Sequence, residues 1–119
     1  MIDYVDPLPP VIQFLKLYLP SLPVYGESIP AGATLPALLV KNAGGNGYTR
    51  LQLLTRADSQ LEATKVLIEA MNTLERYAGE IQGLWITWCQ HETAPIADRD
   101  EDTGKPEAWC YMELDNVEA

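Results

Sequence analysis

Basic side chains are scarce in this 119-residue sequence: eight Lys and Arg stand against 17 Asp and Glu, which gives a formal net charge of −9. Such a chain repels phosphate backbones, so sequence-specific binding of nucleic acid is disfavoured. Its apolar runs are far shorter than the roughly 20 residues that a membrane-spanning helix needs. No basic stretch opens the N-terminus, so we expect neither export nor membrane association.

Reactive side chains are also few. Cys89 and Cys110 are the two cysteines, and His91 is the one histidine. Each cysteine lies in an apolar, aromatic segment, where a small thiol packs well, so we expect free thiols. The spacing of Cys89, His91 and the neighbouring carboxylates matches no zinc site. A nucleophile–base pair of Cys89 and His91 is disfavoured, because residues two apart in a strand share a face without a guaranteed hydrogen bond.

The rest of the composition is typical of a folded domain. Hydrophobic residues make up 47% of the chain and charged residues 21%, so enough apolar surface is available to offset the entropy lost on folding. A chain of this length fits one domain with one core. We therefore expect a single domain over residues 1–119.

The first half of the sequence predicts one helix and three strands. Asp6 and the prolines after it favour a helix start, and Leu19-Pro20 ends this helix. The helix is so apolar that it should pack on both sides, against its own sheet or a neighbouring subunit. Strands are expected over residues 24–27, 35–43 and 48–55. The middle strand is buried on both faces, and Gly44 to Gly47 form a hairpin turn after it.

The second half predicts a long helix and two strands. Residues 59–62 match a capping box, and Gly79 ends the helix. Its core face comprises Ala63, Val66, Leu67, Ala70, Met71, Leu74, Tyr77 and Ala78. Aromatic-rich strands over 84–89 and 108–114, joined by a loop over 90–107, hold all three tryptophans, which predicts large cross-strand contacts. The fold class is α+β, with two helices packed on a mostly antiparallel sheet of about four to five strands.

An acidic stretch, "IADRDEDTGKPEAW", holds three aspartates at alternating positions: Asp98, Asp100 and Asp102. These match the first, third and fifth positions of a calcium EF-hand loop, but Thr103 and Trp109 stand where the glycine and the glutamate belong. A calcium site is therefore disfavoured.

The triplet Asp102-Thr103-Gly104 also occurs in aspartic proteases, where the catalytic carboxylates are buried. Here the neighbours of the triplet are charged and solvated, so the buried environment that this chemistry requires is not expected. The stretch is better explained as a charged turn with positive φ at Gly104. The glycines at 44–47 lack the lysine and the following helix of a phosphate-binding loop. We therefore expect no catalytic residues, no metal, no cofactor and no enzymatic activity.

Four segments carry a resemblance to a known family. They are "LYLPSLPVYGESIP", "LPALLVKNAGG", "YTRLQLLTRADS" and "DTGKPEAWCYMEL". In this layout the chain resembles the tail terminator, or tail completion, proteins of long-tailed bacteriophages. The likeness covers nearly the whole chain through short patterns, without a catalytic signature.

The resemblance implies a virion structural protein of the tail and neck that is assembled in the host cytoplasm. Subunits of this family form a homo-oligomeric ring, typically a hexamer, on the end of the tail tube. The ring stops polymerisation of the tail tube protein and offers a head–tail joining surface to the connector or stopper protein. DNA would pass through the lumen without sequence-specific binding, and no membrane is involved.

The resemblance also implies that long loops make the subunit contacts. The loops in question cover residues 28–34, 44–47 and 90–107. Interface candidates within them are Ile29, Asn46, His91, Asp98, Asp100, Glu101 and Asp102. A lumen lined by the carboxylates of this set would let DNA slide without sticking.

Three other functions remain open. The chain could be another neck component, such as a head-completion, stopper or minor tail protein. It could instead be a small acidic module that inhibits a basic partner, which predicts a monomer capped by that partner. A tight metal ion on Asp98, Asp100 and Asp102 would revive a metal-dependent enzyme.

Overall fold

A computed structural model describes residues 5–115, so both ends of the domain expected over residues 1–119 lie outside the described residues. Its elements follow in chain order: α1 (Leu8–Tyr18), β1 (Val24–Tyr25), β2 (Ala37–Asn42), β3 (Thr49–Arg56), α2 (Gln60–Tyr77), a 3-10 turn (Ala78–Glu80), β4 (Trp88–His91), β5 (Ile96–Arg99) and β6 (Pro106–Asp115). No helix among these residues is long and apolar enough to cross a membrane.

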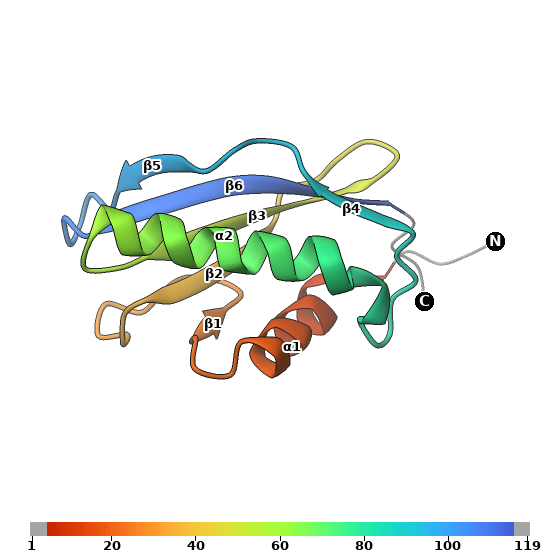
Figure 1. The fold of residues 1–119 in the computed structure, drawn as a ribbon, viewed down its shortest axis with the longest axis horizontal. Helices are drawn as coiled ribbons and strands as arrows, with labels where there is room; N and C mark the ends of the chain where they lie inside the picture. Colours follow the sequence, from red (N-terminus) through yellow and green to blue (C-terminus); the bar gives the residue numbers. More distant parts are fainter. Residues whose placement is uncertain (1–4, 116–119) are drawn as a thin grey trace.

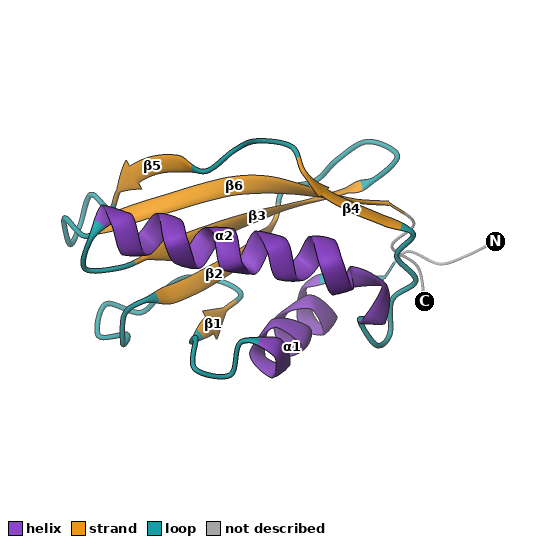
Figure 2. Ribbon diagram, viewed as in Figure 1, coloured by secondary structure: helices purple, strands orange, loops and turns teal. Residues whose placement is uncertain are grey.

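The strands form one mixed sheet in the order β1-β2-β3-β6-β4, and β5 also pairs with β6. β1 runs parallel to β2, and the remaining pairs are antiparallel. Both helices lie on the same face of this sheet (Figures 1 and 2). The α+β class is thus confirmed, with six strands instead of four to five.

The sixth strand lies in the region expected to be a loop. β5 pairs with the start of β6, and β4 pairs with its end, so β4 and β5 together form one interrupted edge strand. At the interruption the Thr93 hydroxyl accepts a hydrogen bond from the Tyr111 amide at 3.2 Å, in place of a strand carbonyl. β5 escaped prediction because all of its residues are exposed, which leaves no alternation of apolar and polar positions to detect.

The expected tryptophan contacts do not form. β4 begins at Trp88 and not at residue 84, and Trp85 and Trp88 are exposed. Trp109 packs edge-on against Tyr111, its neighbour on the same face of β6, with ring centroids 5.3 Å apart. The apolar run over 84–89 was therefore a misleading strand signal, because its two tryptophans face solvent.

The main core lies between the helices and the sheet. α2 begins as predicted, because the Ser59 hydroxyl accepts a hydrogen bond from the Glu62 amide at 3.1 Å. Alternate residues of β3 and β6 face the helices and are buried: Leu51, Leu53, Ala108, Cys110, Met112 and Leu114. Thr55 joins them, since its hydroxyl donates to the Ala63 carbonyl of α2 at 2.6 Å. The two-residue alternation in the strands and the three- to four-residue spacing in α2 thus direct apolar side chains into the same core layer.

A smaller cluster covers part of the opposite face of the sheet. Ile29 from the loop after β1 packs there with Ala37 and Leu39 of β2. Because Leu38 and Val40 point into the main core, β2 is buried on both faces, as predicted. The hairpin turn after it has positive φ at Gly44, Gly45 and Gly47.

Candidate functional site

The acidic stretch forms the tip of the β5–β6 hairpin, and we call residues 96–106 the acidic finger. Asp100 organises its turn: its carboxylate accepts hydrogen bonds from the Thr103 amide at 2.9 Å and the Thr103 hydroxyl at 2.6 Å. Gly104 has φ +73° and donates its amide to the Asp100 carbonyl at 2.8 Å. The charged turn predicted from the sequence is confirmed, including the positive φ at Gly104.

Three cations hold the finger in place. Arg56 of β3 lies 3.3 Å from the Asp100 carboxylate and 2.9 Å from that of Glu107. Lys105 lies 2.9 Å from Asp58, just before α2. The Arg99 guanidinium donates to the Gly104 carbonyl. The finger is therefore tied to both the sheet and the start of α2.

These contacts shift the pKa values of two carboxylates in opposite directions. Hydrogen bonds from Thr103, helped by Arg56, lower the pKa of Asp100. Burial raises the pKa of Glu107, although Arg56 acts against this shift. Arg56 thus bridges two acids whose environments differ.

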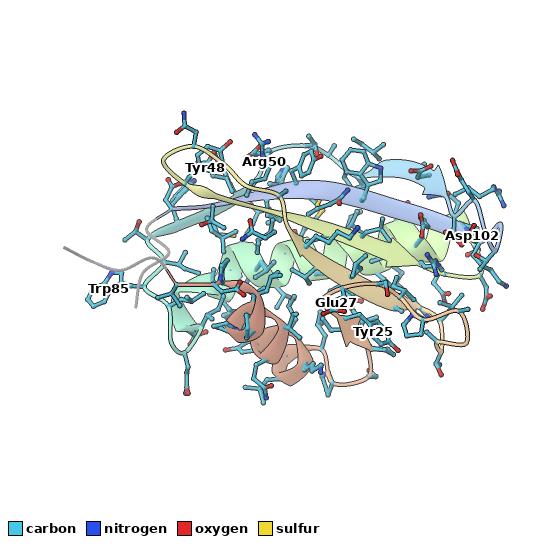
Figure 3. All side chains as sticks on the ribbon, turned by 180° about the vertical axis from the view of Figure 1, so that it is seen from behind. Tyr25, Glu27, Tyr48, Arg50, Trp85 and Asp102 are labelled. Carbon is cyan, nitrogen blue, oxygen red and sulfur yellow. The ribbon has the colours of Figure 1, made fainter. Side chains whose placement is uncertain are left out.

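The remaining finger carboxylates point into solvent. Asp98, Glu101 and Asp102 are exposed, and within residues 5–115 none of them forms an ion pair. In the same range, no three His, Cys, Asp or Glu side chains are grouped so that they could hold a metal ion. The finger thus presents free negative charge at the end of the sheet, where Figure 3 marks Asp102.

His91 and the two thiols lie on the helix side of β4 and β6. The His91 Nδ1 atom is 2.7 Å from the Glu75 Oε1 atom, which joins β4 to α2. Burial raises the pKa of both Cys89 and Cys110 to about 12. Both thiols are free, as predicted, and at neutral pH they are protonated and therefore weak nucleophiles.

The candidate interface residues do not form one site. Ile29 is buried in the smaller cluster, whereas Asn46 is exposed at the β2–β3 turn. The strand register places that turn and the finger at opposite ends of the sheet, because Thr49 pairs with Leu114 while Arg56 pairs with Glu107 (Figure 1). The structure groups only the finger carboxylates.

Helix α1 exposes an apolar side that the sequence had suggested would be covered. Val11, Phe14 and Leu15 face the core, but Leu17 is 74% exposed. A groove of about 550 Å³ runs along this side between α1 and residues 80–82. The Tyr18 hydroxyl closes its edge by donating to Glu80 at 2.9 Å. Packing on both sides therefore does not occur within the subunit.

Further apolar side chains are exposed on other surfaces. On α2, Leu61 is 83% and Ile68 is 40% exposed. Trp85 is 71% exposed and stands at the end of the molecule opposite the finger (Figure 3). Leu61 and Ile68 lie off the core-facing period of α2, so that period alone does not mark them. Their apolar character at outward-facing helix positions was the signal that could have identified them.

The uncovered part of the sheet carries a cluster around Arg50. Its guanidinium bonds the Glu92 carboxylate at 3.1 Å and lies over the Tyr111 ring, 5.2 Å from the centroid. The Tyr48 hydroxyl accepts a further hydrogen bond from Arg50 at 2.8 Å. Figure 3 shows Tyr48 and Arg50 on this side. Tyrosine and arginine are enriched at protein interfaces, so this surface also suits a partner.

No protein-family model and no curated protein matches the chain.

Proposed function

We propose that the chain is a structural subunit of a bacteriophage neck that forms a ring on the end of the tail tube. The ring stops tube polymerisation and joins the tail to the head connector, as the resemblance to tail terminator proteins implies. The protein acts through shape and charge, and the −9 charge of each subunit keeps DNA from sticking in the lumen.

One observation carries the proposal: large apolar side chains are exposed on several separate surfaces of the subunit. They lie on α1 (Leu17), along α2 (Leu61 and Ile68) and at residues 85–88 (Trp85 and Trp88). A module that blocks one partner needs one such surface. A ring subunit needs two different surfaces for its neighbours and further ones for the tube and the connector.

The test is the mass of the purified chain at micromolar concentration, alone and with the tail tube protein encoded in the same genome. We expect a closed oligomer of the 13.2 kDa chain, with six copies, in solution or on tube ends. We also expect tubes to stop growing when the chain is added during polymerisation.

Other results would select the alternatives. A ring that binds the connector but leaves tube growth unchanged would indicate a stopper or head-completion protein. A monomer that forms a one-to-one complex with a basic protein would replace the proposal with the inhibitor-like module.

A further inference from the structure

One line of outward-facing residues on α2 contains no acidic side chain, which is unusual in so acidic a chain. Residues at three- and four-residue steps opposite the core form what we call the outer stripe: Leu61, Lys65, Ile68, Asn72 and Arg76. All five are exposed, and the stripe contains two cations and no carboxylate. Outward helix positions in a soluble protein are normally polar, so Leu61 and Ile68 mark this line as a contact surface.

The cations of the outer stripe are available to a partner. No ion pair within residues 5–115 involves Lys65 or Arg76. Arg76 lies over the neighbouring Tyr77 ring, 6.0 Å from its centroid, and keeps its charge at the surface. By contrast, Arg50, Arg56 and Lys105 on the sheet side are all committed to carboxylates of their own subunit.

The acidic finger carries the complementary features. Asp98, Glu101 and Asp102 are exposed anions without a cation, and Ile96 at the base of the finger is 38% exposed. The finger of the same subunit does not cover the outer stripe, since Leu61 remains almost fully exposed beside it. One subunit thus displays both halves of a matching pair on different surfaces.

We propose that the outer stripe of α2 binds the acidic finger of a second copy of this chain. The inference rests on the proposed function and names the contact that closes the ring. Lys65 and Arg76 meet Asp98, Glu101 and Asp102, while Leu61 and Ile68 pack against Ile96. Because the stripe and the finger are different surfaces, the contact is head-to-tail, which is the type that generates rings.

Charge complementarity favours a second copy as the occupant. Two copies of a chain with charge −9 repel each other over most of their surface. The outer stripe is a place where an acidic neighbour meets cations instead. Burial of the apolar side chains stabilises the contact, and the charges select the partner and set its orientation.

This contact changes the role expected for the finger. Its carboxylates lie in the interface between subunits, and other acidic residues line the lumen. A finger variant therefore affects assembly before it affects DNA passage.

The experiment uses charge reversal in the full chain. The stripe variant carries Lys65→Glu and Arg76→Glu, and the finger variant carries Glu101→Lys and Asp102→Lys. We expect each variant alone to assemble at least about tenfold more weakly, because like charges then meet at every joint. The control is Lys16→Glu, which reverses an exposed cation on α1 outside the stripe.

Mixing the two variants gives the decisive measurement. In an equimolar mixture, reversed stripes meet reversed fingers and native stripes meet native fingers, so we expect mixed oligomers of wild-type size. Sedimentation velocity measures the assembly, and circular dichroism with thermal melting shows that each variant is folded.

Each other outcome overturns the inference. If the wild-type chain assembles and either variant assembles as well, the contact lies elsewhere, while the proposed ring stands. If both variants fail to assemble and their equimolar mixture also fails to assemble, the contact again lies elsewhere and the proposed ring still stands. If the variants assemble normally but block DNA passage, the finger lines the lumen. A wild-type chain that stays monomeric with and without tube protein overturns both proposals.

Discussion

Asp100 and its partners show how single side chains shape the candidate site. The sequence analysis placed all three alternating aspartates among the interface candidates, but the structure separates them. Asp100 is used inside the subunit by Thr103 and Arg56, whereas Asp98 and Asp102 remain exposed. Part of this division is local, because Thr103 lies three residues from Asp100 in the chain. The ion pair with Arg56 appears only in the fold, because Arg56 is distant from the finger in the chain.

Acid should weaken the contribution of Asp100 to stability. Its folded-state pKa is lowered from the ordinary value of 3.8, so its stabilisation is complete above that value and is lost as pH falls through the folded pKa. We expect Asp100→Asn to be less stable than wild type at neutral pH. The difference between them should shrink as pH falls below 3.8. Thermal melts between about pH 7 and pH 3 measure this difference.

Asp98→Asn is the matched control for Asp100→Asn, because it removes a carboxylate of the same hairpin that forms no ion pair within residues 5–115. It should follow the wild-type curve. Burial raises the pKa of Glu107, so its contribution has the opposite sign and is lost as pH rises through its folded pKa. A constant gap between Asp100→Asn and wild type at every pH would contradict the role given to Asp100.

The sequence predicts some helices and strands of this fold better than others. Local signals fixed α2, since a capping residue at its start and a regular apolar period coincide with the observed helix. Gly79, expected to end the helix, instead lies inside the 3-10 turn that follows it, without a positive φ. β5 has no such signal, because it is an exposed edge strand held by pairing with β6. The candidate site divides in the same way: the turn at Gly104 was predictable from local sequence, whereas the ion pairs of Arg56 with Asp100 and Glu107 were not, because they join distant parts of the chain.

The N-cap of α2 should be a measurable source of stability. Ser59→Ala removes the hydrogen bond that the Glu62 amide donates to the Ser59 hydroxyl. We expect a loss of about 1 kcal/mol in the free energy of unfolding. Urea denaturation measures this loss. Ser21→Ala, at an exposed turn position, is the control and should change stability by less than about 0.5 kcal/mol.

The molecule as a whole is elongated, 46 × 25 × 23 Å, and its distinct surfaces are spread along this length. The finger stands at one end of the sheet and Trp85 at the other (Figure 3). α1 and α2 cover one face (Figure 1), and the Arg50 cluster lies on the other (Figure 3). Surfaces spread in this way could meet several neighbours at once, which the proposed ring requires.

Global unfolding should control access to the central thiol. Cys110 is fully buried between β6 and the helices, so a reagent reaches it only when the core opens. In a Cys89→Ala background, the opening free energy from thiol labelling should match that from urea denaturation within about 1 kcal/mol. Labelling of Cys110 that is much faster would mean that β6 opens locally, and that the sheet is not one cooperative unit.

The broken edge formed by β4 and β5 also limits how copies of the subunit can associate. A long straight edge would offer its amides and carbonyls to any passing strand and invite fibrous aggregates. Here the Thr93 hydroxyl takes over a backbone partner in the middle of the edge. Backbone pairing with another strand along the whole of this edge is thereby disfavoured, so a contact made at this edge would have to use side chains.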